Sequence, residues 1–213
     1  MQKRILVLAP HTDDGELGCG ATIANLIKKG AEIYYLAFSS CQESLPLDFP
    51  DDTLEKELMS ATNKLGIKQE NVKILDFKVR YFERDRQKIL ETMVDIGKKI
   101  NPDIVFSPSV HDIHQDHVTI ASECLRAFKK KTIFQYEVPW NNYTFDNQAF
   151  YCVDEDDVNV KINAIACYKS QINRDYTKPD YIRAQLLTHG VQIGERYAEV
   201  FEVPHIIIKG GFN

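Results

Sequence analysis

Residues 5–20 read ILVLAPHTDDGELGCG, and this stretch decides the fold. Ile5–Ala9 form a short apolar run, which is typical of a buried strand. The run ends abruptly and is followed by His11, Asp13 and Asp14, so these polar side chains are expected at the carboxyl end of the strand. In open α/β sheets, ligands bind at this edge.

Apolar runs and helical patterns alternate through the first part of the chain. A helical pattern over residues 22–29 follows the opening stretch and stops at Gly30, a residue typical of helix ends. Further strands are expected at 32–38, 72–77 and 103–107, and further helices at 53–65, 87–100 and 118–130. The remainder is less regular, with strand-like pieces at 133–136, 149–153, 198–203 and 205–208 and helices at 158–168 and 181–187.

This alternation predicts an α/β fold of the Rossmann-like kind. Strand–helix repeats build a largely parallel sheet with helices on both faces. We expect residues 1–213 to form a single domain, with the site at the carboxyl ends of the first and fourth strands.

Composition excludes several classes of protein. A net charge of −5 argues against a nucleic-acid-binding surface. No apolar run approaches the length of a membrane span or of a signal-peptide core. The five cysteines form no C-x-x-C pair, which favours reduced thiols in a cytoplasmic protein. The sequence leaves a homo-oligomer open.

The glycines of the opening stretch raise the alternative of a nucleotide-binding loop. The dinucleotide fingerprint is G-x-G-x-x-G, whereas Gly15, Gly18 and Gly20 stand in the reverse order. The adjacent carboxylates would repel a pyrophosphate but suit a metal cation. An H-x-D-D run is also common for capping reasons alone, so this stretch by itself leaves both interpretations open.

A second polar loop follows the fourth expected strand. Residues 109–117 read SVHDIHQDH and hold three of the six histidines. In a doubly wound sheet the first and fourth strands can lie side by side, so His117 or His114 is expected beside His11 and Asp14.

Two imidazoles and one carboxylate form the three-ligand set of a catalytic zinc site. Such an ion lowers the pKa of its water towards about 7, and a neighbouring carboxylate then serves as the general base. A remaining histidine can polarise the carbonyl or protonate the leaving group. The same donor set accepts other divalent ions, so the sequence does not fix the metal.

These motifs resemble the PIG-L/LmbE-like deacetylases, zinc-dependent hydrolases that remove acetyl from N-acetylglucosamine-type substrates. The similarity lies in H-x-D-D at 11–14, L-G-C-G at 17–20 and H-x-D-H at 114–117. Further similar segments are K-x-x-A at 161–164, Ser170-Gln171 and the Y-A-E-x-F run at 197–201. The matches span most of the chain in order.

The resemblance implies roles for individual residues. His11, Asp14 and His117 would bind Zn²⁺, and Asp13 would act as the base for attack by metal-bound water. His114 would stabilise the oxyanion or assist the departing amine. Asp116 would orient a histidine. Apart from the resemblance, Asp112 is expected to order the loop through a hydrogen bond.

The sequence departs from the family pattern at several positions. Thr12 and Gln115 replace prolines, Gly15 separates the aspartates from Glu16, and Leu54 stands where an arginine near the sugar is common. The candidates for contact with the substrate are Arg80, Arg84, Trp140, Asn141 and His189. For each of these the alternative is ordinary packing or surface solvation.

The resulting hypothesis is a zinc-dependent hydrolase that removes an N-acetyl group from an amino sugar or its conjugate. Two alternatives remain at this stage. One is a zinc amidohydrolase or esterase that acts on a non-sugar acyl substrate. The other is a metal-binding module without catalysis, which the presence of Asp13 and His114 beside the ligands disfavours.

Overall fold

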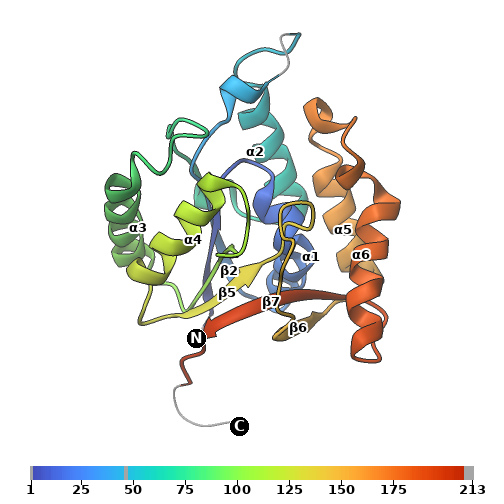
Figure 1. The fold of residues 1–213 in the computed structure, drawn as a ribbon. Coiled ribbons are helices and arrows are strands. Elements are labelled where there is room, and N and C mark those ends of the chain that lie inside the picture. The colour runs from blue at the N-terminus through green and yellow to red at the C-terminus, as the bar shows by residue number, and fades with distance from the viewer. Residues whose placement is uncertain (1, 46–47, 209–213) are drawn as a thin grey trace.

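The computed structural model describes residues 2–45 and 48–208 of the chain, and its centre is a twisted sheet of seven strands (Figure 1). The strands in chain order are β1 Arg4–Ala9, β2 Glu32–Ala37, β3 Val72–Ile74, β4 Ile104–Pro108, β5 Thr132–Tyr136, β6 Ala149–Cys152 and β7 Ala198–His205. Their order across the sheet is β3-β2-β1-β4-β5-β7-β6. The first five are parallel, and β7 runs antiparallel to both β5 and β6.

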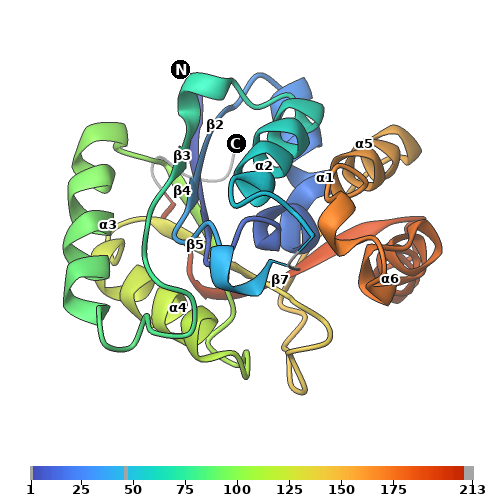
Figure 2. The same cartoon turned by 90° about the horizontal axis from the view of Figure 1, so that it is seen from above.

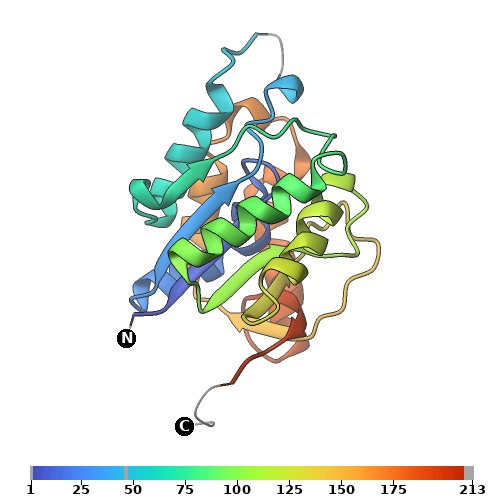
Figure 3. The same cartoon turned by 90° about the vertical axis from the view of Figure 1, so that its left-hand side faces the viewer.

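Helices cover both faces of the sheet (Figure 2). They are α1 Asp14–Lys28, α2 Thr53–Leu65, α3 Arg86–Ile100, α4 Gln115–Ala127, α5 Glu155–Ile165 and α6 Pro179–Gln192. The green helices α3 and α4 lie on one face, in front of the sheet in Figure 3, and the remaining four lie on the other. Within the described residues, no helix is long and apolar enough to cross a membrane.

The alternation of strand side chains explains this layering. Ile5, Val7 and Ala9 of β1 pack in the core beneath α1 and α2, whereas Leu6 and Leu8 pack beneath α3 and α4. Successive side chains of a strand point to opposite faces of the sheet. A strand that is apolar at every position must therefore be covered by helices on both faces. The predicted Rossmann-like fold with helices on both faces is therefore confirmed.

Several expected boundaries differ from the observed ones. The first helix begins at Asp14, well before the expected range of 22–29, and α4 begins at Gln115 and not at 118. The first turns of both helices consist largely of polar residues, so the apolar periodicity that predicts a helix is absent there. In place of the two strand pieces expected at 198–203 and 205–208 there is one strand, β7, which ends at His205 and pairs with β5 across an irregularity. The expectation of a strand over residues 206–208 was wrong.

Close packing of α1 against the sheet explains two of its glycines. A side chain at Gly15 would overlap the ring of Tyr35, and one at Gly18 would overlap the ring of Tyr136. The two glycines therefore allow the helix to approach two tyrosines of the sheet. This packing role accounts for them without a nucleotide-binding loop.

Helix α1 is broken at Cys19, and a buried ion pair spans the break. The Lys161 ammonium donates to the Leu17 carbonyl and to Glu199, both at 2.6 Å. The Glu199 carboxylate accepts the backbone N–H groups of Ala21 and Thr22, at 3.2 and 2.7 Å. The pair thus satisfies the backbone groups that the break frees on both of its sides.

Candidate metal centre

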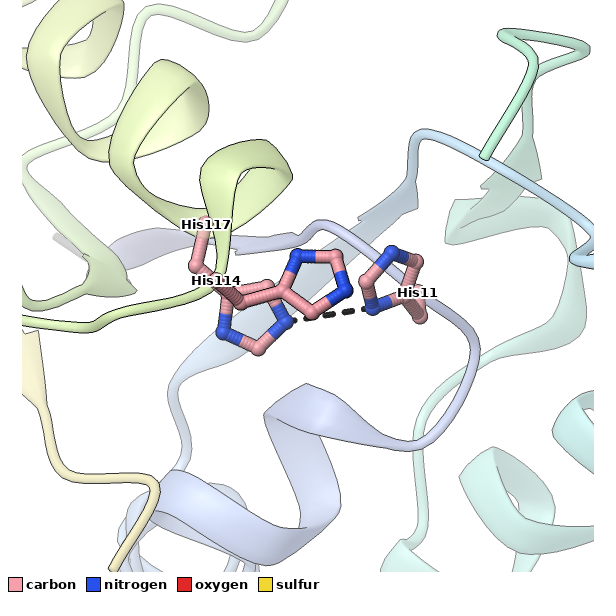
Figure 4. Close-up of side chains that lie close together, drawn as sticks. All are labelled: His11, His114 and His117. Carbon is pink, nitrogen blue, oxygen red and sulfur yellow. Dashed lines mark hydrogen bonds between the residues drawn. The ribbon is translucent and has the colours of Figure 1, made fainter. Parts of the chain in front are cut away.

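Two loops that are distant in sequence meet at the carboxyl edge of the sheet (Figure 4). Strand β1 pairs directly with β4, so the residues that follow the two strands become neighbours. His11 lies in the turn between β1 and α1, Asp14 is the first residue of α1, and His117 lies in the first turn of α4. The imidazoles of His11 and His117 point toward one another.

Three side-chain atoms of these residues converge on one point. Asp14 Oδ2 lies 3.2 Å from both His11 Nδ1 and His117 Nε2, and these two nitrogens are 3.1 Å apart. Ligand atoms that surround a zinc ion tetrahedrally at ordinary bond lengths lie about 3.3 Å from each other. The spacing of the three atoms therefore fits a small divalent cation.

The outward nitrogens of the same two rings face carboxylates. His11 Nε2 is 3.1 Å from Asp116 Oδ2, and His117 Nδ1 is 2.7 Å from Asp112 Oδ2. Both carboxylates are buried. A carboxylate that accepts the outer N–H of a neutral imidazole leaves the inner nitrogen with a free lone pair. The donor set thus fits a metal in its chemistry as well as its spacing.

Local hydrogen bonds fix the second loop and connect it to another segment. Asp112 accepts the backbone N–H of His114 at 2.7 Å. Asp116 accepts the backbone N–H groups of Arg80 and Phe82, at 2.6 and 3.3 Å. The carboxylate beside His11 therefore also holds the segment between β3 and α3 against the site.

The third imidazole, His114, stands beside the other two. Nitrogens of His11, His114 and His117 all lie within 4.8 Å of one another. His114 Nδ1 accepts the backbone N–H of Asp116 at 3.2 Å, so the neutral ring carries its proton on Nε2. Burial and the neighbouring His117 and His11 lower the pKa of His114 to about 4. The three imidazoles are thus one possible ligand group, and His11 and His117 together with Asp14 Oδ2, at 3.2 Å from each of them, are another.

Asp13 lies next to the converging atoms without joining them. Its side chain makes no capping bond to α1 and lines the cleft above the site. Burial, and secondarily the charge of Asp14, raise its pKa to about 6. A carboxylate with such a pKa is ionised at neutral pH and can accept a proton.

The converging residues perturb one another strongly. Burial opposes the charge on Asp14, but the facing His117 and His11 outweigh it and hold its pKa well below the usual range. Burial also opposes protonation of His117, yet Asp14 and Asp112 raise its pKa to about 10. In the metal-free protein, protons therefore occupy the place that suits a cation.

A cleft of about 600 Å³, including its mouth open to solvent, leads to the site. Its polar walls come from loops at the carboxyl edge and from the segment that follows α5. The residues that line it include Asp13, Ser44, Arg80, His114, Arg174 and Tyr176.

The structure places the two candidate arginines differently. Arg80 lines the cleft, and its guanidinium donates to Ser44 Oγ at 3.1 Å. Arg84 lies over the ring of Tyr81, 5.3 Å from its centroid, and is not among the residues that line the cleft.

The other three substrate candidates lie away from the cleft wall. Trp140 stacks on Tyr176, with ring centroids 3.7 Å apart, and it is Tyr176 that lines the cleft. Asn141 accepts the backbone N–H of Ile113 through its carbonyl at 3.2 Å, which orders the histidine-rich loop. His189 is buried on α6, 3.5 Å from Glu137.

A buried cluster beneath the turn of residues 11–14 was absent from the sequence-based set. Glu16 is fully buried and bonds to the hydroxyls of Tyr35 and Tyr168. The same two hydroxyls also lie within hydrogen-bond distance of the Thr12 carbonyl, at 3.1 and 2.8 Å. The cluster thus supports the backbone between His11 and Asp13. No periodicity signals it, because its members come from α1, β2 and the segment after α5.

This cluster gives a testable dependence of stability on pH. Burial raises the pKa of Glu16 to about 8, so the metal-free protein should lose stability as pH rises from about 4.5, the unfolded-chain value, through about 8. Glu16 is expected to contribute roughly 2–3 kcal/mol to the loss between about pH 6 and pH 9, and His117, whose pKa is raised to about 10, adds to the total. Glu16→Gln should remove only the share of Glu16 and so make the dependence less steep. Urea unfolding at the two pH values measures the effect, with the exposed Glu83→Gln as control. Equal slopes in the wild type and Glu16→Gln would contradict the assignment.

Comparison with known proteins agrees with these features. The family model described as PIG-L: GlcNAc-PI de-N-acetylase matches residues 6–128. An uncharacterized deacetylase of Escherichia coli, YaiS, is 31% identical over 173 residues, which cover 79% of this chain and 92% of that protein. The diacetylchitobiose deacetylase of Thermococcus kodakarensis is 26% identical over 221 residues, which cover 92% and 81%.

The fold comparison gives the same result. The solved structure of N,N'-diacetylchitobiose deacetylase from Pyrococcus horikoshii superimposes with a TM-score of 0.78 at 23% identity, covering 94% of this chain and 83% of that one. The family match takes in more than half of the chain and includes both loops, with His11, Asp14 and His117. The chain therefore belongs to the PIG-L family.

Proposed function

We propose that the protein is a metal-dependent deacetylase that hydrolyses the N-acetyl group of an amino sugar or amino-sugar conjugate. One observation carries the proposal: three ligand atoms from two distant loops converge at 3.1–3.2 Å beside a free carboxylate and a neutral imidazole. The names of the matching relatives support deacetylation, and two of them act on diacetylchitobiose.

His11, Asp14 and His117 are the residues that would hold the ion, which we take to be Zn²⁺. A divalent ion bound by three protein ligands supplies Lewis-acid polarisation of the acyl oxygen and lowers the pKa of water. A purely structural site would need neither Asp13 nor the access that the cleft provides.

Asp13 acts as the general base. Its carboxylate takes a proton from the water that attacks the acetyl carbonyl, and it later returns that proton to the departing amine. This role requires an ionised carboxylate that is not itself a ligand. The pKa of about 6 and the position of Asp13 outside the three converging atoms support it.

His114 stabilises the oxyanion that forms on the acetyl carbonyl. Its pKa of about 4 keeps the ring neutral at neutral pH, and its Nδ1 is engaged as an acceptor. The group that faces the reaction is therefore the Nε2–H donor. Asp112 and Asp116 keep His117 and His11 in the required tautomers.

A direct assay tests the proposal. Purified protein loaded with Zn²⁺ should release acetate from acetylated amino sugars, and a chelator should stop the release reversibly. A parallel panel of short acyl amides and esters tests the alternative of a non-sugar substrate. Acetate release that survives complete metal removal would refute the proposal.

Metal binding should also release protons. Burial alone would lower the pKa of His117, but Asp14 and Asp112 raise it to about 10, so the metal-free ring is protonated at neutral pH. Coordination requires the neutral ring, so about one proton or more should leave for each ion bound at about pH 7. Calorimetric titration with Zn²⁺ in two buffers of different ionisation enthalpy measures this number. Identical heats in the two buffers would contradict the assignment of His117 as a ligand.

A further inference from the structure

We propose that Glu202 is a positioning residue for the metal centre. Its carboxylate holds the turn at residues 109–112, and this turn aims Asp112 at the ligand His117. This role rests on the proposed function of the site, to which it adds a residue that lies outside the ligand set.

Glu202 lies on β7 and contacts two loops of the site. Its Oε2 accepts the Ser109 hydroxyl at 2.5 Å, and its Oε1 lies 2.7 Å from His111 Nδ1. The same Oε1 accepts the backbone N–H of Asp146 at 3.1 Å. Ser109 and His111 belong to the histidine-rich loop after β4, and Asp146 belongs to the loop between β5 and β6. One carboxylate, on a strand that supplies no ligand, therefore holds both loops.

The burial of Glu202 indicates that its bonds serve the loops. The residue is 4% exposed, and within the described parts of the chain its ion-pair partner is the imidazole of His111, with no lysine or arginine beside it. Burial of a carboxylate costs free energy, so an apolar side chain at this position would stabilise β7 more. The hydrogen bonds of Glu202 go to the two loops, which is what a role in placing them requires.

Ser109 connects Glu202 to the turn that carries Asp112. Its hydroxyl donates to Glu202 and accepts the backbone N–H of His111 at 2.9 Å. Its carbonyl accepts the backbone N–H of Asp112 at 3.4 Å. From this turn, Asp112 Oδ2 reaches to within 2.7 Å of His117 Nδ1. The position of the Asp112 carboxylate, and with it the orientation of the His117 ring, therefore depends on Glu202.

The loop between β5 and β6 reinforces this arrangement. Asp146 of this loop donates to Glu202, and the Asn141 carbonyl accepts the backbone N–H of Ile113 in the histidine-rich loop at 3.2 Å. The two loops are thus joined to each other and to β7. The pairing of β7 with β5 and β6 is made by the backbone, so loss of the Glu202 carboxylate should disturb the loops more than the sheet.

Zn²⁺ affinity tests the role of Glu202 without turnover. Glu202→Gln keeps the shape of the side chain but offers one acceptor oxygen fewer. We expect it to weaken Zn²⁺ binding by about 10-fold, the low end of the range for groups that orient metal ligands, because Glu202 acts through Asp112. Ser109→Ala breaks the same connection and should have a similar effect. The double variant should lose much less than the product of the two factors, because both changes remove one link. Competition with a chromogenic chelator measures the dissociation constants.

Glu123→Gln is the matched control. Glu123 is a fully buried carboxylate on α4, the helix that carries His117, and it pairs with Arg86 and Arg126. Its loss should lower stability in urea but change the affinity for Zn²⁺ by less than about 2-fold.

An NMR signal separates positioning of His117 from general loss of stability. The ring N–H proton of His117 that faces Asp112 should shift or exchange faster with water in Glu202→Gln and Ser109→Ala. In Glu123→Gln the same proton should keep its resonance and its exchange rate.

An affinity for Zn²⁺ within about 2-fold of wild type in both variants, or a loss no larger than that of Glu123→Gln, would overturn the role of Glu202. If Glu202→Gln does not fold, Ser109→Ala alone decides. A wild type that binds no Zn²⁺ would refute both this role and the metal centre. Zn²⁺ binding without acetate release from acetylated amino sugars would refute the deacetylase function alone.

Discussion

Asp13→Asn is expected to lower kcat for acetate release by about 10²–10⁴-fold while the protein keeps its metal. The amide has nearly the shape of the carboxylate but cannot accept a proton from the attacking water. Asp13 lies outside the set of three converging atoms, so its loss should leave those atoms in place. Steady-state kinetics together with metal analysis of the purified variant measure the two quantities.

Asp14→Asn is the matched comparison for this variant. Asp14 is the neighbouring residue, but its Oδ2 lies 3.2 Å from each of the two imidazole nitrogens. The Asp14 variant should lose metal and activity together, whereas the Asp13 variant should lose activity alone. If Asp13→Asn retained full activity, or if it lost its metal as Asp14→Asn does, Asp13 would not be the base.

Lys161→Met is expected to destabilise the fold by about 3–5 kcal/mol. Lys161 is 1% exposed and bonds both the Leu17 carbonyl and Glu199 at 2.6 Å. Its removal leaves the Glu199 carboxylate buried without a cation and the break of α1 at Cys19 without its donor. Urea unfolding of the metal-free protein measures the loss.

A double-mutant cycle separates the ion pair from simple loss of packing. The double variant Lys161→Met/Glu199→Gln should lose less stability than the sum of its two single variants, because no unpaired charge stays buried. Lys56→Met is the control, since Lys56 pairs with Asp52 at the surface and is 73% exposed. That variant should change stability by less than about 1 kcal/mol. Strict additivity of the Lys161 and Glu199 variants would contradict this account of the helix break.

The parallel sheet could be predicted because its strands are apolar at successive positions. Ile5–Ala9 is covered on both faces, and the alternation of such runs with helices permits few other arrangements. The start of α1 was not predicted because Asp14, Gly15 and Glu16 lack the apolar period of a helix. Asp13 and Glu16 do have the spacing of a helix cap, but the Asp13 side chain makes no capping bond. Gly15 and Glu16 are held instead by Tyr35 of β2, which contacts them from outside the helix.

The residues of the cleft walls were likewise only partly predictable from the sequence. Arg80 was among the sequence-based candidates, but Arg174 was not, because an arginine in an irregular segment carries no local signal of its neighbours. Trp140, the only tryptophan of the chain, was a candidate for contact with the substrate. Tyr176 is the aromatic residue that lines the cleft, and Trp140 packs against it.

The sequence by itself determined the layered α/β fold, the family and the edge of the sheet where the polar loops lie. These properties follow from patterns among neighbouring residues, such as apolar periods and the short turn in which His11 donates its backbone N–H to Asp14 at 2.8 Å. Only the tertiary structure decided how closely His117, which the family resemblance indicated, approaches His11 and Asp14, and which arginines line the cleft. Both depend on how α4 and the segment after α5 pack on the sheet, and this packing is set by contacts between residues far apart in the chain.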